Sequence, residues 1–315
     1  MTTNYRYSLN GNAYSNFVTP HIDTNNINIA IIQPGSWGDN INSTMMLIPL
    51  KNKYPSSQID VYTTKQYASA FHNNTFIDNI ISADIEGKND SLNFVHVYPP
   101  LLENKGYTHI INASPFINPN DWSSGLYPQL GENLMLSWCK ALEKINVHYD
   151  LPLRTILMPT IEEKKRAESK ILPYVTNSKI KNLAEIHGES GQTFWNHEWT
   201  EKVVQKLVDF DQVIFISHNG MTDQIKRLQS KYPLNVLYVG DLSIRECTYV
   251  FNQCDRFFSV SSGLSNACNT NYCKTSIRWV EVVNSLVCSS APIRKEGKVF
   301  WHDNNITKFI DWLSE

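Results

Sequence analysis

The chain has 315 residues, of which 42% are hydrophobic and 18% are charged, a composition typical of a folded protein rather than a disordered one. Because domains commonly contain roughly 100 to 200 residues, this length predicts two domains. The 28 Lys and Arg residues nearly balance the 30 Asp and Glu residues. The net charge of −2 argues against a general attraction to nucleic acid or to anionic lipid.

Targeting signals and cysteine clusters are not evident in the sequence. The opening residues, MTTNYRYSLN, lack the basic and apolar layout of a secretory signal, and no apolar run approaches the ~20 residues that span a bilayer. We therefore expect a cytoplasmic protein with no integral membrane segment. The six cysteines form no C-x-x-C pair and no Cys and His cluster with the spacing of a zinc site. Reduced structural thiols and no bound metal are expected.

The first half of the chain begins with a polar segment and continues as alternating strands and helices. Residues 1–26 are rich in Asn, Tyr and Ser, which predicts an extended N-terminal arm. The strands predicted after it are residues 27–32, 58–64, 78–84 and 108–114, and the predicted helices are residues 40–54, 65–74 and 132–145. Continuous apolar strands that alternate with helices indicate a parallel sheet covered on both faces.

The second half repeats this alternation after a proline-containing segment at residues 151–159. Its predicted helices are residues 161–172, 198–210, 222–232, 243–254 and 264–272, and its predicted strands are residues 180–187, 212–217, 235–240 and 256–260. We therefore expect an α/β protein with two Rossmann-like doubly wound domains, residues 27–150 and 151–300, facing each other across a cleft. Residues 301–315 contain an amphipathic helix that we expect to pack back towards the first domain.

The loop after the first strand is the strongest candidate site. In an open parallel sheet, ligands bind where strands end and helices begin. The loop contains Gly35, Ser36, Trp37, Gly38, Asp39 and Asn40, and its two glycines permit a tight path that brings the Asp39 carboxylate to a helix entrance. Asp39 is either a base that reaches the cleft or a helix cap worth about 1 kcal/mol. Because the loop lacks G-x-G-x-x-G, a nicotinamide dehydrogenase is disfavoured.

A second loop lies between the strand at 256–260 and the following helix. It contains Ser261, Ser262, Gly263, Leu264, Ser265 and Asn266. Small residues at a helix N-terminus suit an anion such as a diphosphate, although a capped helix without a ligand explains them equally well. His187, Ser190 and His218 also follow strands and are weaker candidates at the same edge. The D-x-D sequence at residues 209–211 precedes a strand, which places it at the wrong edge for a metal-bound nucleotide.

With both loops placed, the chain resembles the ADP-heptose:lipopolysaccharide heptosyltransferase family, glycosyltransferase family 9, over much of residues 27–270. The segment IAIIQPGSWGDNINSTMMLIPLKNKYPSSQIDVYTT matches the family's opening strand, Gly-Asp loop, helix, Tyr-Pro break and second strand in order. SSGLSNA looks like the family's Asp-Ser/Thr-Gly-x-x-His-x-Ala motif, and TFWNHEWTEKVVQKL looks like its Lys-Arg-Trp-Pro segment and the helix after it. The resemblance implies the two-domain GT-B fold.

The sequence departs from the family pattern at charged and histidine positions. Ser261 stands in place of the motif's acidic residue, Asn266 in place of its histidine, and Thr193 and Phe194 in place of the basic pair. Without those cations, less positive charge faces a departing diphosphate.

The resemblance implies an inverting glycosyltransferase that uses a nucleoside-diphosphate sugar, with no cofactor and no metal, and with Asp39 as the general base. The donor would contact the loop at 261–266 together with His187, Ser190 and His218, and the acceptor would contact Gly35, Ser36, Trp37, Gly38 and Asn40. A glycan or lipopolysaccharide-type acceptor and a hydroxymethylated base in DNA both remain open. Two alternatives are a non-catalytic nucleotide-sugar or glycan-binding module and a Rossmann enzyme such as an epimerase, which would require bound nicotinamide.

Overall fold

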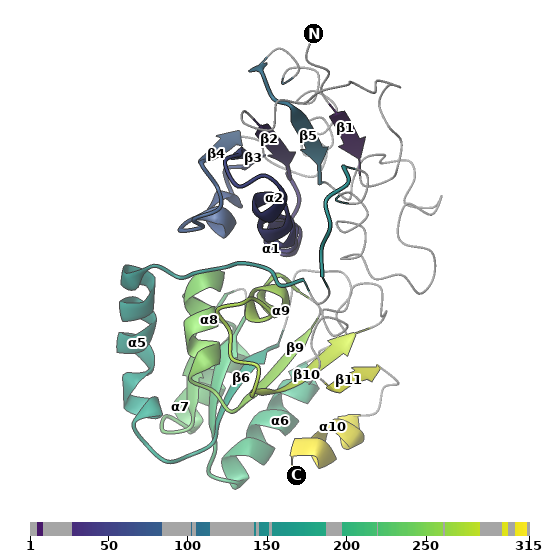
Figure 1. The fold of residues 1–315 in the computed structure, drawn as a ribbon. Helices are drawn as coiled ribbons and strands as arrows, with labels where there is room; N and C mark the ends of the chain where they lie inside the picture. The colour runs from purple at the N-terminus through teal and green to yellow at the C-terminus, as the bar shows by residue number, and fades with distance from the viewer. Residues whose placement is uncertain are drawn as a thin grey trace. The chain divides into compact units, whose positions relative to one another are not determined.

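The protein was analysed as a computed structural model of all 315 residues, which forms two compact units, residues 1–157 and 158–315. The residues described are 5–8, 27–83, 102, 105–113, 142, 145–150, 153–186, 197–218, 220–260, 262–283, 298–301 and 306–313. Each unit contains one parallel sheet with helices packed on it (Figure 1). The predicted α/β class and its two Rossmann-like sheets are therefore confirmed.

The first unit has a five-stranded sheet in the order β1-β5-β2-β3-β4. Its strands are β1 (Tyr5–Ser8), β2 (Asn28–Ile32), β3 (Gln58–Thr64), β4 (Asn79–Ala83) and β5 (His109–Asn112). All four pairings are parallel. The strand β1 lies inside the predicted polar arm, so the expectation that residues 1–26 only precede the sheet is wrong at 5–8.

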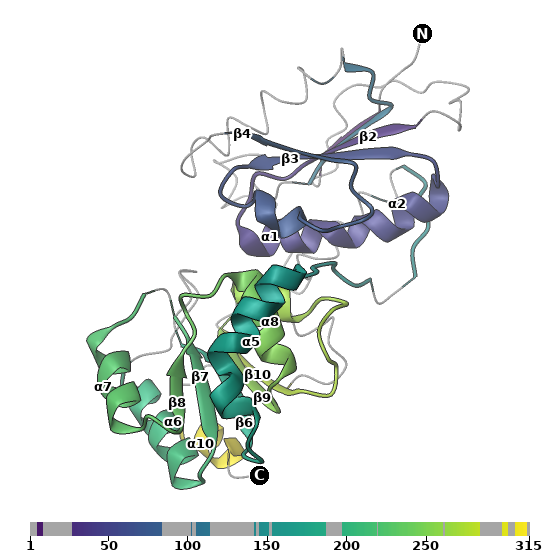
Figure 2. The ribbon, with the colours of Figure 1, turned by 90° about the vertical axis from the view of Figure 1, so that its left-hand side faces the viewer.

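Two short helices follow β2 directly and carry the first candidate loop. They are α1 (Trp37–Ser43) and α2 (Leu47–Lys53), joined by the 3-10 turn η1 (Thr44–Met46). Figure 2 shows them running along one face of the sheet, beneath β2 and β3. Their apolar side chains Ile41, Met45 and Leu50 are fully buried, which is what a helix covering a sheet requires. The helix predicted at 65–74 is instead the four-residue 3-10 turn η2 (Ala68–Phe71).

The second unit has a six-stranded sheet in the order β11-β10-β9-β6-β7-β8, again with every pairing parallel. Its strands are β6 (Lys181–Glu185), β7 (Val213–Ser217), β8 (Val236–Tyr238), β9 (Arg256–Val260), β10 (Arg278–Val283) and β11 (Lys298–Trp301). Its helices are α5 (Ile161–Val175), α6 (His197–Asp209), α7 (Asp223–Lys231), α8 (Ile244–Asn252), α9 (Gly263–Cys268) and α10 (Ile306–Leu313). The strands β10 and β11 were not predicted.

Successive strand residues of the second sheet face two different hydrophobic cores. Ile214 and Phe258 face α6 and α7, whereas Leu183 and Phe215 face α5 and α8. This alternation explains why the strands read as continuous apolar runs: both faces are covered. The double covering is the feature that defines a doubly wound sheet.

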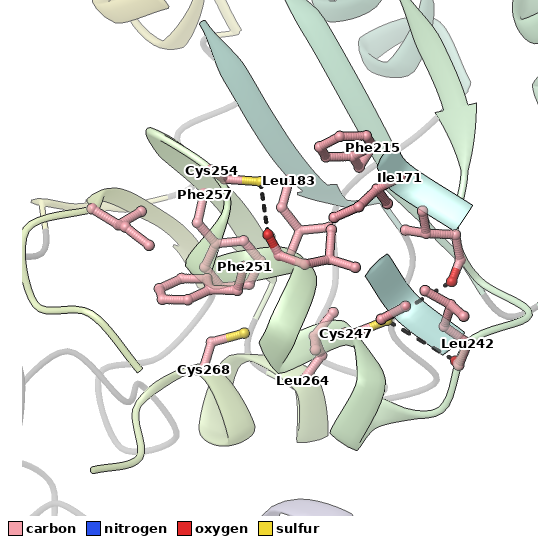
Figure 3. Close-up of a cluster of buried hydrophobic side chains, with 14 of the residues drawn as sticks. Ile171, Leu183, Phe215, Leu242, Cys247, Phe251, Cys254, Phe257, Leu264 and Cys268 are labelled. Carbon is pink, nitrogen blue, oxygen red and sulfur yellow. Dashed lines mark hydrogen bonds between the residues drawn. The ribbon is translucent and has the colours of Figure 1, made fainter. Parts of the chain in front are cut away.

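Four cysteines lie in the core on the α8 side of the second sheet (Figure 3). Cys247, Cys254, Cys268 and Cys273 are buried and unoxidised, as expected, whereas Cys139 and Cys288 lie outside the described residues. Burial raises the pKa of Cys247 to about 12. Burial also raises the pKa of Cys254, so both of these thiols are held in the protonated, unreactive form.

The C-terminal helix α10 belongs to the second unit. It packs against α6, and Phe309 makes an edge-to-face contact with Phe258, with ring centroids 5.4 Å apart. Phe309 is 3% exposed within the core on that side. The apolar face of α10 therefore contributes to the core of the second unit, and the packing of residues 301–315 back towards the first domain stays a prediction. None of the described helices has the length and apolar character needed to cross a membrane.

Candidate functional site

The first candidate loop follows β2, a strand at which the strand order reverses, and the second follows β9, which lies next to such a strand, β6. In the first unit, β3 lies on one side of β2 and β5 on the other. In the second, β7 lies on one side of β6 and β9 on the other. A crevice at the carboxyl ends of the strands forms at such a switch point, and it is the usual ligand position in open parallel sheets. The topology therefore places both loops where ligands bind.

The Asp39 side chain is anchored to its own loop. Ser36 is the N-cap of α1, and Asp39 is the third residue of that helix. Oδ2 of Asp39 accepts hydrogen bonds from the Ser36 amide at 3.0 Å and from the Ser36 hydroxyl at 2.8 Å. Within the part of the chain that the structure describes, Oδ1 accepts no hydrogen bond. Asp39 therefore caps the helix with one oxygen and leaves the other available.

Burial and hydrogen bonding act on the Asp39 pKa in opposite directions. Burial is the larger effect and raises the pKa above its ordinary value, while the two hydrogen bonds from Ser36 lower it. A carboxylate with a raised pKa is a stronger base, and such shifts are typical of catalytic carboxyl groups. The structure thus combines a fixed carboxylate with one free oxygen and raised basicity.

Several other residues of the first loop are arranged differently from what the sequence suggested. Ser36 is exposed and Trp37 is half-buried, with its ring in edge contact with Tyr67 at 6.1 Å. These two residues remain accessible to an acceptor. Gly38 is buried, and Asn40 is 0% exposed with both ends of its amide engaged. The Asn40 side chain is therefore not available to an acceptor.

Gly35 is required by close packing. A Cβ atom at Gly35 would lie 2.7 Å from Oδ2 of Asp39 and 2.8 Å from Oε1 of Gln33. Real Cβ contacts are not that short, so any side chain here would displace the carboxylate or the glutamine. The bare backbone at Gly35 lets the Asp39 carboxylate lie directly against the loop.

In the second loop, the hydroxyl of Ser262 is already committed. Ser262 caps α9, and its Oγ accepts a hydrogen bond from the Ser265 amide at 3.1 Å. The same Oγ donates its only proton to Oε2 of Glu185 at 2.5 Å. The Ser265 hydroxyl in turn bonds to the amide and carbonyl of Ser262. Because the protons of both hydroxyls are already used within the protein, neither hydroxyl can donate to a phosphate.

The amides of Gly263 and Leu264 remain as donors in this loop, since neither has a partner among the described residues. Asn266 stands where the family motif has a histidine, and its Nδ2 donates to the Ser262 carbonyl at 2.8 Å. It supports the loop from within the helix. An anion at this loop would meet backbone N–H groups and no side-chain cation from residues 262–266.

Glu185 and Gln33 are two site residues that the sequence analysis missed. Each is a polar residue at or just after the end of an apolar strand, and both are buried. Glu185 joins β6 to the loop after β9 through Ser262, and Nε2 of Gln33 donates to the Ala113 carbonyl at 2.6 Å, which joins β2 to β5. Each hydrogen bond spans the switch point of its sheet. The sequence feature that could have identified both residues is a polar side chain at the end of a buried, apolar strand.

His218 lies after β7, as predicted. Its Nδ1 is 2.7 Å from the Gly220 carbonyl oxygen, which can only accept, so Nδ1 is the donor of this hydrogen bond. Tyr238 donates to the His218 carbonyl at 3.1 Å, and a Cβ at Gly240 would lie 2.1 Å from that carbonyl. The backbone at His218 is therefore tightly packed. The predicted donor residues Ser261, His187 and Ser190 lie outside the described residues.

Other polar clusters in the second unit do not form a site. Asp211 of the D-x-D sequence pairs with Lys179. A surface hollow of about 600 Å³ lies between α6, α7 and α10, away from the carboxyl edge. Two of its charged residues, Arg227 and Glu201, pair with one another at 3.6 Å. Among the residues described, no group of three or more His, Cys, Asp or Glu side chains could hold a metal ion.

Comparison with known proteins identifies the fold. No protein-family model and no curated protein sequence matches the chain. A glycosyl transferase family 9 protein from Veillonella parvula DSM 2008 superposes with a TM-score of 0.65 at 16% identity, over 94% of this chain and 93% of that chain. The E. coli ADP-heptose lps heptosyltransferase II gives 0.64 at 13% identity, over 91% and 98%. E. coli heptosyltransferase WaaC with ADP gives 0.58 at 13% identity, also over 91% and 98%. The chain therefore has the GT-B fold of these glycosyltransferases, as the sequence resemblance implied.

Proposed function

We propose that the protein is an inverting glycosyltransferase that moves a sugar from a nucleoside-diphosphate sugar to an acceptor hydroxyl, with Asp39 as the general base. The observation that carries the proposal is the Asp39 carboxylate itself. It follows the central strand of the first sheet at the switch point, one oxygen is fixed by Ser36, and burial raises its pKa. The fold, shared with family 9 enzymes, supports the assignment.

In the proposed reaction, Oδ1 of Asp39 accepts the proton of the acceptor hydroxyl. The acceptor oxygen attacks the anomeric carbon on the face opposite the diphosphate, and the bond between that carbon and the diphosphate oxygen breaks, with its electron pair leaving on the diphosphate. A single displacement inverts the anomeric centre. Exclusion of water from the site would limit hydrolysis of the donor.

On the donor side, we propose that the amides of Gly263 and Leu264 hold the departing diphosphate. Backbone N–H groups that point at developing negative charge stabilise it without reorganisation. We propose no metal ion and no cofactor for this step. His218 follows β7 at the same edge of the second sheet, and we propose that it also contacts the donor.

Two classes of acceptor are considered for this reaction, and we propose the glycan. A glycan or lipopolysaccharide-type acceptor would meet the exposed Ser36 and the ring of Trp37, because sugars commonly pack against aromatic faces. A hydroxymethylated base in DNA is the other acceptor we consider, and it would require a basic groove. The net charge of −2 favours the glycan.

One observation favours a different function, a non-catalytic nucleotide-sugar or glycan-binding module. The carboxylate of Glu185, not a cation, bonds to the second loop through Ser262. A negative charge beside a diphosphate weakens the stabilisation of a leaving group. The glycosyltransferase and the binding module would both bind the nucleotide sugar, but only the glycosyltransferase would turn it over.

A thermal-shift screen against nucleoside diphosphates and nucleotide sugars tests the proposal first. A ligand at 100 times its dissociation constant stabilises a protein by roughly 2.7 kcal/mol, so we expect a clear rise in unfolding temperature with the donors of one base. Binding accompanied by release of the nucleoside diphosphate supports the transferase. Binding without any turnover supports the module, and the absence of a shift with every nucleotide contradicts both.

A further inference from the structure

The buried amide of Asn40 holds the backbone of the first loop. Its Nδ2 donates to the Gly35 carbonyl at 2.6 Å and to the Ser36 carbonyl at 2.8 Å. Both N–H groups of the amide are therefore used, and both partners can only accept. This fixes which end of the amide is nitrogen, and hence the direction of its carbonyl oxygen.

The carbonyl end of the same amide is fixed from the sheet. Oδ1 of Asn40 accepts a hydrogen bond from Oγ1 of Thr63 at 2.7 Å. Thr63 lies in β3 and is 0% exposed. A strand that is paired on both sides therefore controls the orientation of the Asn40 side chain, and a buried bond of this kind is costly to leave unmade.

These bonds continue directly to the Asp39 carboxylate. Ser36, whose carbonyl Asn40 holds, is the residue whose amide and hydroxyl bind Oδ2 of Asp39. On the other side of the loop, Oε1 of Gln33 accepts from the Gly35 amide at 3.0 Å. The loop is thus held from β2 and from β3, with Gly35 packed between Gln33 and Asp39 without room for a Cβ.

We propose that Asn40 and Thr63 are positioning residues that hold the Asp39 carboxylate in the geometry needed to receive a proton. The inference rests on the proposed function, because it assumes that Asp39 is the base. Asn40 acts through Ser36, and Thr63 acts through Asn40, so neither touches substrate. A base misplaced by about 1 Å loses on the order of 100-fold in rate, so the loss of a positioning residue should have a measurable effect on the reaction rate.

The next residue in β3 offers a matched control. Thr64 is 2% exposed, and its buried Oγ1 has no hydrogen-bond partner among the described residues. Thr63→Val and Thr64→Val make the same chemical change at the same depth in the same strand. Only the first removes the bond to Asn40. Thr63→Ser retains the hydroxyl and serves as the conservative rescue.

The decisive measurement is the titration of the Asp39 carboxyl by ¹³C NMR, with aspartate labelled and Asp39→Asn used to assign the resonance. Burial is the main cause of the raised pKa, so a loosened loop in Thr63→Val admits water and lowers the Asp39 pKa towards its ordinary value. We expect Thr63→Ser and Thr64→Val to titrate as the wild type does. An unchanged Asp39 titration in Thr63→Val overturns the inference, and the result needs no substrate.

Turnover of the donor found in the thermal-shift screen provides the second readout. We expect Thr63→Val to lower kcat about 10- to 100-fold with KM for the donor unchanged, and Thr63→Ser to restore it. Wild-type kcat in Thr63→Val, together with lost turnover in Asp39→Asn, overturns the inference and leaves the proposed function standing. Wild-type turnover in Asp39→Asn overturns the proposed function itself.

Discussion

Burial of the Asp39 carboxylate raises its pKa, and the hydrogen bonds from Ser36 lower it. Burial has the larger effect. The balance matters because a general base must be ionised to work, yet gains strength as its pKa rises. Ser36 therefore limits how far burial raises the Asp39 pKa, because each hydrogen bond that Ser36 donates keeps the carboxylate ionised to a lower pH.

Ser36→Ala tests this balance. The substitution removes the 2.8 Å bond from the hydroxyl and leaves the amide bond in place. The Asp39 pKa then rises further, so the acidic limb of the kcat/KM profile moves to higher pH. Ser36→Thr keeps a hydroxyl and should leave the limb in place. A limb that moves to lower pH in Ser36→Ala would contradict the role assigned to Ser36.

Among the elements, β5 contributes a buried histidine whose titration affects the stability of the first unit. His109 is 1% exposed, stacks against Tyr54 at 5.4 Å, and has its pKa lowered to about 4 by burial. The unfolded chain binds a proton near the ordinary histidine pKa of about 6.5, but the folded protein does not. The folded state is therefore destabilised as the pH falls from about 6.5 towards 4.

The expected size of that loss follows from the shift in the His109 pKa. It approaches about 3 kcal/mol near pH 4, since one pKa unit corresponds to about 1.4 kcal/mol. Urea unfolding of the wild type and of His109→Gln between pH 7 and pH 4.5 measures it. The variant should lose less stability over this range. Equal pH dependence of the two proteins would show that His109 is not the group responsible.

The helices α5 and α8 are joined by a buried ion pair. Arg245 is 1% exposed, its Nε contacts Oε1 of Glu163 at 2.8 Å, and the guanidinium also donates to the Met158 carbonyl. Arg245→Met removes the buried cation that pairs with Glu163 and should lower the free energy of unfolding by about 3 kcal/mol. Arg227, exposed and 3.6 Å from Glu201, is the matched control, because its replacement by Met should cost under about 1 kcal/mol.

Chemical denaturation followed by circular dichroism compares these two variants. The two-unit chain need not unfold in one step, so the midpoint of the second-unit transition is the quantity to compare. Similar midpoints for Arg245→Met and Arg227→Met would show that the buried pair contributes no more than a surface pair.

Across the whole molecule, the sequence predicted those strands whose burial on both faces made them continuous apolar runs, such as 28–32 and 213–217. It missed β1, β10 and β11, because tyrosine, arginine, glutamate and lysine interrupt their apolar pattern. The helix expected at 65–74 is a 3-10 turn followed by Asn73 at φ 61°, a conformation that ends helices.

The candidate site was also only partly predictable from the sequence. Asp39 was identifiable because its Gly-Asp loop follows a strand directly and every relevant residue is adjacent in sequence. Thr63 and Ala113 support that loop from β3 and from the end of β5, and Glu185 bonds to Ser262 across 77 positions. Those contacts arise from the parallel strand order, which places distant strand ends side by side, and a single sequence does not give that order.

The most direct test of the central claim is release of nucleoside diphosphate from a bound nucleotide sugar, measured with acceptor present for the wild type and Asp39→Asn side by side. Loss of a general base typically costs 10²- to 10⁴-fold. The account predicts a fall of at least about 100-fold in Asp39→Asn, with unchanged affinity for the donor. Equal rates of release from the two proteins would contradict it.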